Sequence, residues 1–199
     1  MININNAVQF QHLIWDRIMK SASVVVDATC GNGHDLLYLA ERAQPECHLY
    51  GIDIQEQALN ASRELLASKK LHSNVTITFL HNSHDIALHQ AIKENTIDLI
   101  IFNWGYLPGG DHSIITQPQN TIEALHNAFP KLAKDGIITI VAYPGTPEGM
   151  EEKDVLHTYI SKLDQSKYNV CHWQPINQAN QPPELYLIQK RWFLIKINM

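Results

Sequence analysis

The stretch VVVDATCGNGHDLLYLA, residues 24–40, places a strand, a glycine turn and a helix next to one another. Its consecutive valines are typical of a strand buried on both faces, as the strands of parallel sheets are. Gly31 and Gly33 bracket the turn that follows. At such a turn the backbone bends sharply and approaches a ligand closely, so a side chain would be in the way. The stretch therefore predicts an α/β protein with a ligand at its first turn.

The alternation of strand and helix continues along the chain. Short β-branched segments predict five strands, at residues 23–27, 47–53, 74–80, 97–103 and 136–143. Segments with a 3.6-residue period predict helices at residues 6–20, 34–43 and 56–69, and a helix between each later pair of these strands. Strands separated by helices pair in parallel, and their ligand lies at the carboxyl ends.

The last part of the chain departs from this alternation. Residues 168–174 and 184–197 both predict strands, and the segment between them is rich in proline and asparagine and too short for a helix. We expect an antiparallel hairpin there. The whole pattern predicts an α/β fold with a Rossmann-like, doubly wound, mostly parallel seven-stranded sheet, formed by residues 1–199 as a single domain.

Composition limits the class of protein. Of the 199 residues, 45% are hydrophobic and 18% are charged, a balance typical of globular proteins. No apolar run reaches the roughly 20 residues needed to cross a bilayer, and the first residues do not resemble a signal peptide. We therefore expect a cytoplasmic protein that does not enter membranes. The three cysteines are scattered and are expected to be buried free thiols: Cys30, Cys47 and Cys171.

The formal net charge of −5 argues against a protein that coats nucleic acid by bulk electrostatics. Basic residues cluster only in pairs, and solvated surface is the expected use of each pair. The pairs are Lys69 with Lys70, Lys131 with Lys134, and Lys190 with Arg191.

The glycine turn differs from the fingerprint of a dinucleotide site. Nicotinamide and flavin sites carry GxGxxG, with the start of the helix facing a pyrophosphate. Here GNG surrounds Asn32, Leu36 replaces the third glycine, and Asp35 in the first helical turn would repel phosphate. Asp27 adds an acid at the end of the strand. Two carboxylates near the turn favour a cation without phosphates, such as S-adenosylmethionine with its ammonium and sulfonium groups.

Asp53 ends the second expected strand, twenty residues after Gly33, and Gln55 follows closely. A carboxylate at this spacing accepts hydrogen bonds from the two ribose hydroxyls of an adenosine. The alternative is that Asp53 only caps the next helix. The turn and Asp53 together favour a nucleoside cofactor.

Three histidines and an acid lie in HNSHDIALH, residues 81–89, which raises the question of a metal site. His84 and His89 are five positions apart and lie on different helical faces, and His81 precedes the expected helix cap at Ser83. We therefore predict no metal. Ser83 and His84 are candidates for contacts to the base or the ribose, with an ordinary capped helix as the alternative.

The fourth strand ends at Asn103 and leads into the segment FNWGYLPGGDH, residues 102–112. Amino-group methyltransferases place an asparagine or aspartate, prolines and an aromatic residue here. Carbonyl oxygens hold the hydrogens of the acceptor amine, and the aromatic ring stacks on the base that carries it. Asn103 is the candidate amide, Tyr106 or Trp104 the candidate stacking ring, and Asp111 a candidate base. Alternatively, Asn103 caps a turn and Tyr106 belongs to the core.

Several segments together resemble one family, the bacterial tRNA 5-(aminomethyl)-2-thiouridine methyltransferases of the MnmM type. The resemblance covers nearly the whole chain. Its segments, in order, are DATCGNGHD, GIDIQ, NSHD, FNWGYLPGGDH, AYPGTPEGMEE and NQPPELYLIQK. It implies a class I fold that uses S-adenosylmethionine to convert the 5-aminomethyl group of a tRNA wobble uridine to methylaminomethyl.

The resemblance also implies roles for individual residues. Contacts to the cofactor are implied for Asn32, Asp35, Asp53, Gln55, Ser83 and His84. The acceptor side is implied for Asn103, Tyr106, Gly110 and Asp111, and the mouth of the site for Tyr143, Glu148 and Gly149. The family commonly has a histidine where this chain has Thr146, so any role of that histidine is in doubt here.

The expected partner is the anticodon loop of tRNA, which needs only a few phosphate contacts and base stacking. Candidates for these contacts are Trp173, Lys190, Arg191 and residues 177–180, although each is also compatible with ordinary surface or core. An apolar first helix and last strand are compatible with a homodimer or with packing on the sheet of a monomer. Alternative functions are methylation of rRNA or of a small amine, a binding module for the cofactor without catalysis, and an oxidoreductase.

Overall fold

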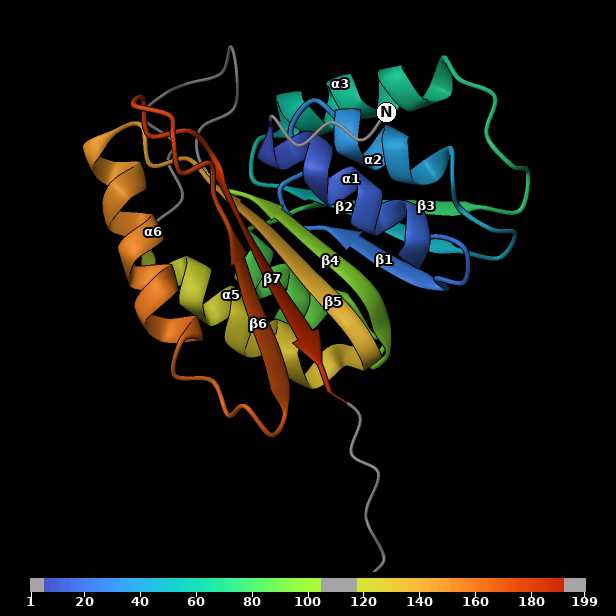
Figure 1. The fold of residues 1–199 in the computed structure, drawn as a ribbon. Helices are drawn as coiled ribbons and strands as arrows, with labels where there is room; N and C mark the ends of the chain where they lie inside the picture. The colour runs from blue at the N-terminus through green and yellow to red at the C-terminus, as the bar shows by residue number, and fades with distance from the viewer. Residues whose placement is uncertain (1–5, 105–117, 192–199) are drawn as a thin grey trace, which may run out of the picture.

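The computed structural model describes residues 6–104 and 118–191. Its strands form one sheet in the order β3-β2-β1-β4-β5-β7-β6 (Figure 1). The strands are β1 Val24–Asp27, β2 His48–Asp53, β3 Thr76–His81, β4 Ile97–Asn103, β5 Leu132–Ala142, β6 Tyr168–Trp173 and β7 Glu184–Lys190. The first five pair in parallel, and β7 pairs antiparallel with both β5 and β6. The predicted seven-stranded, mostly parallel sheet with a final hairpin is confirmed.

Helices precede β1 and connect the strands. They are α1 Ala7–Ile18, α2 His34–Ala40, α3 Glu56–Ala67, α4 His84–Ile86, α5 Pro118–Lys131 and α6 Pro147–Ile160. The first helix begins where Asn6 Oδ1 accepts a hydrogen bond of 2.8 Å from the backbone N–H of Val8. This side chain satisfies one of the amide groups that every helix start leaves without a partner.

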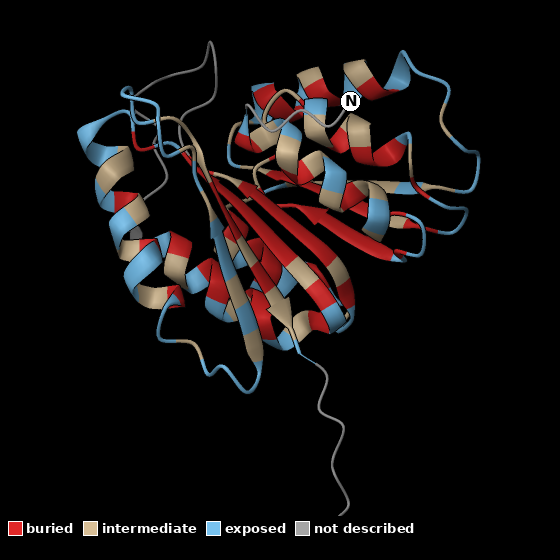
Figure 2. Cartoon of the chain, in the orientation of Figure 1, coloured by how far each residue is buried: buried red, intermediate tan, exposed pale blue. Residues whose placement is uncertain are grey.

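Two layers of helices cover the two faces of the sheet (Figure 1). On one face, Trp15 of α1 and leucines of α2 and α3 pack on β1, β2 and β4. On the other face, α5 and α6 pack on β4 and β5 with residues such as Leu125 and Leu156. The central strands are buried on both faces (Figure 2), which explains the uninterrupted apolar character of residues 24–26 and 99–102.

The structure differs from the expected elements in two places. The α-helix between β3 and β4 is short. It continues directly into a π-helical turn, η1 Ala87–Ala91, and the Ile92 N–H closes this turn by donating to the Ala87 carbonyl oxygen. The fifth strand begins at Leu132, four residues before the expected start, and its pairing with β4 shifts in register between Ile97 and Leu99. The final strand is described only to Lys190.

The structure also tests the expectations for the cysteines and for the apolar face of α1. Cys30 and Cys47 are buried free thiols as expected, but Cys171 is exposed, because it lies on β6 at the outer edge of the sheet. The apolar stripe of α1 packs on the protein's own sheet, where Ala7 joins Val141 and Leu185 in one cluster. No helix within residues 6–104 and 118–191 is long and apolar enough to cross a membrane.

Candidate cofactor and acceptor site

The glycine turn after β1 has the backbone conformation that its sequence predicts. Gly31 and Gly33 have φ angles of 51° and 81°, in the left-handed region that favours glycine. A Cβ atom on Gly33 would lie 2.7 Å from the Oγ of Ser62 on α3. The Ser62 hydroxyl itself donates a hydrogen bond of 2.7 Å to the Gly31 carbonyl. The turn is therefore held tightly against α3 and can present its backbone to a ligand.

Asp53 at the end of β2 braces the same turn. One carboxylate oxygen accepts a hydrogen bond of 2.8 Å from Gly31 N–H, and the other accepts one of 2.8 Å from Gln55 N–H at the start of α3. Burial raises the pKa of Asp53, and these backbone donors lower it in part. Asp53 thus joins the glycine turn to the N-cap residue of α3, but it is not the capping residue itself, because the start of α3 has no side-chain capping hydrogen bond.

Asp27, at the end of β1, is the most deeply buried acid near the turn. It is 0% exposed; Oδ1 accepts a long hydrogen bond of 3.2 Å from Thr29 N–H, and Oδ2 has no partner among the described residues. Burial raises its pKa well above the usual value, and the negative charges of Asp35 and Asp53 raise it further. Acids that repel one another in this way favour a bound cation.

The ammonium and sulfonium groups of S-adenosylmethionine fit this arrangement. The turn leaves no room for a side chain at Gly33, and the unpartnered oxygen of Asp27 can accept a hydrogen bond from a cationic donor. A pyrophosphate would meet repulsion from the same acids. The donor set of the turn therefore matches a positively charged nucleoside.

Asn103 and Asp35 meet at the carboxyl end of the sheet. Asn103 Nδ2 donates a hydrogen bond of 2.8 Å to Asp35 Oδ2, and the backbone N–H of Asn103 donates one of 2.7 Å to Thr29 Oγ1. The candidate acceptor residue at the end of β4 is thereby joined to the candidate cofactor residue of α2.

Two residues of α1 complete this network, and neither was predicted from the sequence as a site residue. His12 Nε2 lies 2.9 Å from Asp35 Oδ1, and the His12 ring stacks on Tyr38 with centroids 3.8 Å apart. Gln11 Nε2 donates a hydrogen bond of 3.4 Å to Asn103 Oδ1. A signal for Gln11 was present, because it lies four residues from both Ala7 and Trp15 on the buried stripe of α1, where a polar residue is out of place.

The segment after β3 places Ser83 and His84 at the start of α4. Ser83 is the N-cap residue, but its side chain makes no capping hydrogen bond. His84 is buried, its Nε2 has no partner among the described residues, and its ring meets Phe102 edge to face at 5.8 Å. Burial lowers the pKa of His84, so the imidazole is held neutral. Both side chains keep hydrogen-bonding capacity for a ligand.

The structure corrects the role considered for Trp104. This residue is 0% exposed and packs against Phe102 with ring centroids 5.5 Å apart, within the apolar cluster between the sheet and α5, so it belongs to the core. The other residues predicted after β4 lie outside the described residues: Tyr106, Gly110 and Asp111.

The segment after β5 is described and explains the threonine at position 146. Thr146 is the N-cap of α6, and its Oγ1 accepts a hydrogen bond of 3.1 Å from Gly149 N–H, so this residue has a structural use. Tyr143 precedes it and is partly exposed; burial and the negative charge of Asp35 raise the pKa of Tyr143 to about 12. Glu148 is exposed in the first turn of α6.

The residues considered for RNA contacts lie at opposite ends of the sheet. Trp173 stacks on Phe10 of α1 at 5.3 Å, at the same end as Asn103, and the exposed residues 177–180 follow it. Lys190 lies at the other end, because β7 runs antiparallel, and its Nζ donates to the Leu132 carbonyl at 2.6 Å. The structure therefore removes Lys190 from the candidates.

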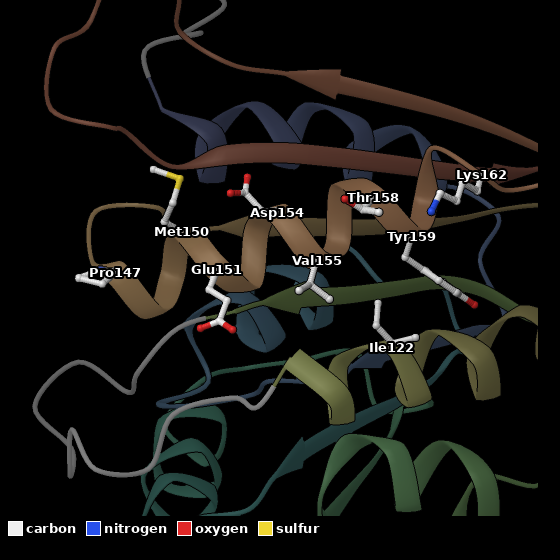
Figure 3. A pocket seen from close by; sticks show the side chains of 9 residues that line it. All are labelled: Ile122, Pro147, Met150, Glu151, Asp154, Val155, Thr158, Tyr159 and Lys162. Atoms are coloured by element: carbon white, nitrogen blue, oxygen red, sulfur yellow. The ribbon is translucent and has the colours of Figure 1, made fainter.

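A separate surface groove of about 740 Å³ lies between α5 and α6 (Figure 3). Its described lining comes from α6, with Ile122 of α5 on the other side, and it includes Met150, Val155 and Tyr159. None of these residues lies at the end of a strand, so the groove is distinct from the turn and its acids.

The sheet order, the glycine turn and the acids at the strand ends define a class I methyltransferase that uses S-adenosylmethionine. Solved structures of this class superpose on nearly the whole chain. A protein from Streptococcus mutans, described as a methyltransferase in complex with S-adenosylhomocysteine, has 34% sequence identity and a TM-score of 0.82, with 94% of this chain and 99% of that chain covered. The cofactor of this chain is S-adenosylmethionine.

Within that class, the chain belongs to the family described as "Putative rRNA methylase", whose profile matches residues 49–189. A protein of that description from Clostridium thermocellum has 38% identity and a TM-score of 0.88, covering 94% of this chain and 99% of its own. The chloroplastic tRNA (mnm(5)s(2)U34)-methyltransferase of Arabidopsis thaliana is 30% identical over 190 residues, 92% of this chain and 69% of that protein. The predicted family resemblance is confirmed.

Proposed function

We propose that this enzyme methylates the amino group of 5-aminomethyl-2-thiouridine at the wobble position of tRNA. The observation that carries the proposal is the hydrogen bond between Asp35 and Asn103, which places an amide beside the acids of the cofactor turn. The 30% identity with the plant tRNA methyltransferase supports tRNA as the acceptor. The net charge of −5 is compatible with an enzyme that grips one loop through few phosphate contacts.

The cofactor side of the proposed site consists of the glycine turn and the residues packed around it. Gly31, Asn32 and Gly33 would approach the cofactor with their backbone, and Asp27 and Asp35 would face its positive groups. The adenosine part would meet the residues after β2 and β3: Asp53, Gln55, Ser83 and His84. When bound, S-adenosylmethionine supplies an activated methyl group and leaves as S-adenosylhomocysteine.

The acceptor side of the proposed site begins at Asn103. Its Oδ1 would accept an N–H of the acceptor amine and thereby point the nitrogen lone pair at the methyl group of the cofactor. The orientation of the amine would then supply most of the rate enhancement. Tyr106 would stack on the uracil ring, and Asp111 would accept the proton that the amine loses. Trp173 and residues 177–180 would contact the anticodon loop at the same end of the sheet.

Mass spectrometry of tRNA nucleosides tests the proposed function directly. The purified enzyme is incubated with S-adenosylmethionine and tRNA that carries 5-aminomethyl-2-thiouridine, and we expect the methylaminomethyl nucleoside to appear. Cells that lack the gene should accumulate the aminomethyl precursor. Unchanged tRNA nucleosides in both experiments would overturn the tRNA assignment.

The same preparation separates tRNA from other acceptors. Total RNA and a panel of small primary amines are offered with methyl-labelled S-adenosylmethionine, and the label is followed into each fraction. Label in rRNA or in a small amine, with none in tRNA, would establish a methyltransferase of another specificity.

A further inference from the structure

Gln11 is a fully buried amide in the middle of α1. The side chain is 0% exposed, and its Oε1 has no hydrogen-bond donor among the described residues. A buried polar atom without a partner destabilises the fold, because it has given up its hydrogen bonds to water. Because such a group lowers the stability of the core, its presence indicates a functional role.

The orientation of this amide follows from its neighbours. The carboxylate of Asp35 lies 2.8 Å from the Asn103 amide and 2.9 Å from His12. An ionised carboxylate only accepts hydrogen bonds, so the NH₂ group of Asn103 must face Asp35. Oδ1 of Asn103 then faces Gln11, which must turn its own NH₂ group toward that oxygen.

Within the described residues, this chain of hydrogen bonds leaves accepting capacity on the carbonyl oxygens of two amides that contact each other. Among the described residues, Asn103 Oδ1 receives one long hydrogen bond, 3.4 Å from Gln11 Nε2, and a carbonyl oxygen can accept two. Gln11 Oε1 receives none among the described residues. The two oxygens belong to amides in direct contact, at the end of the sheet that carries the glycine turn.

We propose that Gln11 Oε1 and Asn103 Oδ1 together accept the two N–H groups of a primary amine. The inference rests on the proposed function and deepens it, because it assigns Gln11 as a residue that selects the acceptor. A neutral primary amine has two hydrogens and one lone pair. With both hydrogens held by the two amides, the lone pair has a single direction, as methyl transfer requires.

The pair of amides also limits the reaction to one methyl group. In the transfer, the lone pair of the nitrogen forms the new N–C bond, the C–S bond breaks with its electrons on sulfur, and the nitrogen releases one proton. The neutral product has one N–H and one methyl group. It satisfies only one of the two oxygens and places an apolar methyl against the other, so a second transfer is disfavoured.

The test compares Gln11→Met with a matched control, Gln9→Met, which changes an exposed residue on the same helix. Methionine keeps the length and removes the polar atoms, and loss of an unpartnered buried carbonyl leaves folding intact or improves it. The melting temperature of each variant and the Kd for S-adenosylmethionine establish that both fold and bind the cofactor like the wild type.

Two measurements then report on Gln11. The first is binding, with S-adenosylhomocysteine present, of tRNA that carries 5-aminomethyl-2-thiouridine and of the same tRNA with 2-thiouridine. We expect the wild type and Gln9→Met to prefer the aminomethyl tRNA by about tenfold and Gln11→Met to lose most of this preference. The second is the product, where Gln11→Met should give a slower first methylation and a detectable dimethylamino nucleoside.

The possible results distinguish a failure of the Gln11 assignment from a failure of the proposed function. If the wild type methylates the aminomethyl tRNA and Gln11→Met equals Gln9→Met in binding preference and product, the assignment of Gln11 is wrong and the proposed function stands. If the wild type neither prefers nor methylates the aminomethyl tRNA, the proposed function fails and the assignment fails with it.

Discussion

The amide of Asn103 donates a hydrogen bond of 2.8 Å to the carboxylate of Asp35, across 68 positions of sequence. Asp35 lies in the first turn of α2, the helix after the glycine turn, and Asn103 ends the central strand β4. One bond therefore joins the residues that we assign to the cofactor and to the acceptor.

Replacement of Asn103 by alanine is expected to reduce kcat/KM for the aminomethyl tRNA by about 100-fold, because the acceptor nitrogen loses its orienting oxygen. The Kd for S-adenosylmethionine should stay within about threefold, since the glycine turn and Asp53 are unchanged. Steady-state kinetics and calorimetry measure the two quantities. Asn60→Ala, on the exposed face of α3, is the control, and equal activity of the two variants would contradict the role of Asn103.

His12 acts on the site through Asp35, so we expect it to be a positioning residue. His12→Ala removes the partner at 2.9 Å and frees the carboxylate to rotate away from Asn103. We predict that kcat falls by about tenfold with a smaller change in KM for tRNA. His12→Gln keeps an N–H donor and should recover most of the rate. Failure of glutamine to improve on alanine would show that ring stacking on Tyr38 matters more than the hydrogen bond.

Gly33→Ala tests the tightness of the turn. The substitution adds a Cβ at a positive φ, which costs roughly 1–2 kcal/mol, and the new atom would lie 2.7 Å from Ser62 Oγ and 2.9 Å from Ser62 Cα. We expect a melting temperature lowered by several degrees and S-adenosylmethionine affinity reduced at least tenfold. The double variant Gly33→Ala/Ser62→Gly should recover only part of the loss, because the backbone of Ser62 remains. Full recovery would mean that φ at residue 33 is not strained.

Glu152 on α6 predicts a pH-dependent stability. It is 4% exposed, accepts a hydrogen bond of 3.0 Å from Thr121 Oγ1, and burial raises its pKa from 4.5 to about 7. Because the folded-state pKa is raised, stability falls as pH rises from 4.5 to about 7, and the full cost remains above that range. Glu152→Gln should therefore melt several degrees higher than the wild type at pH 8 and at the same temperature near pH 4.

The control for this prediction is Glu148→Gln, which changes an exposed glutamate on the same helix. Thermal melts of all three proteins between pH 4 and pH 8 give the comparison. A constant difference between Glu152→Gln and the wild type across this range would contradict titration of the buried carboxyl.

Asp27→Asn separates folding from cofactor binding. Burial and the charges of Asp35 and Asp53 raise the pKa of Asp27, so without a bound cation the fold loses stability as the pH rises above the ordinary pKa of an aspartate. We expect the variant to have a higher melting temperature than the wild type at pH 8 without cofactor. We also expect weaker binding of S-adenosylmethionine, because asparagine cannot supply the carboxylate that a bound cation stabilises. Unchanged affinity in calorimetry would remove Asp27 from the cofactor site.

The local pattern of residues 24–40 was sufficient to predict the fold. Buried valines, a glycine turn and an apolar helical stripe each depend on residues that are close in the sequence. Their patterns can therefore be recognised from the sequence alone. The same holds for Asp53, whose place at the end of a strand follows from the strand itself. The absence of a third glycine and the presence of Asp35 were also sufficient to indicate a cationic nucleoside.

The contacts around Asn103 could not be read in the same way. Gln11 reaches Asn103 across 92 positions, and the contact exists only because α1 packs across the sheet beside β4 and β5. The burial of Trp104 and the place of Lys190 at the far end of β7 depend likewise on which layer covers a strand and which way a strand runs. No local period encodes these choices.

The sequence by itself therefore determined the α/β fold, the type of cofactor and the strand ends that carry the candidate site. The tertiary structure alone decided that a buried glutamine and a histidine of the first helix contact Asn103 and Asp35 of the candidate site, and that a tryptophan next to Asn103 belongs to the core. The physical reason is that helix and strand periods arise from local burial, whereas contacts between distant segments follow from how the whole set of apolar faces packs together.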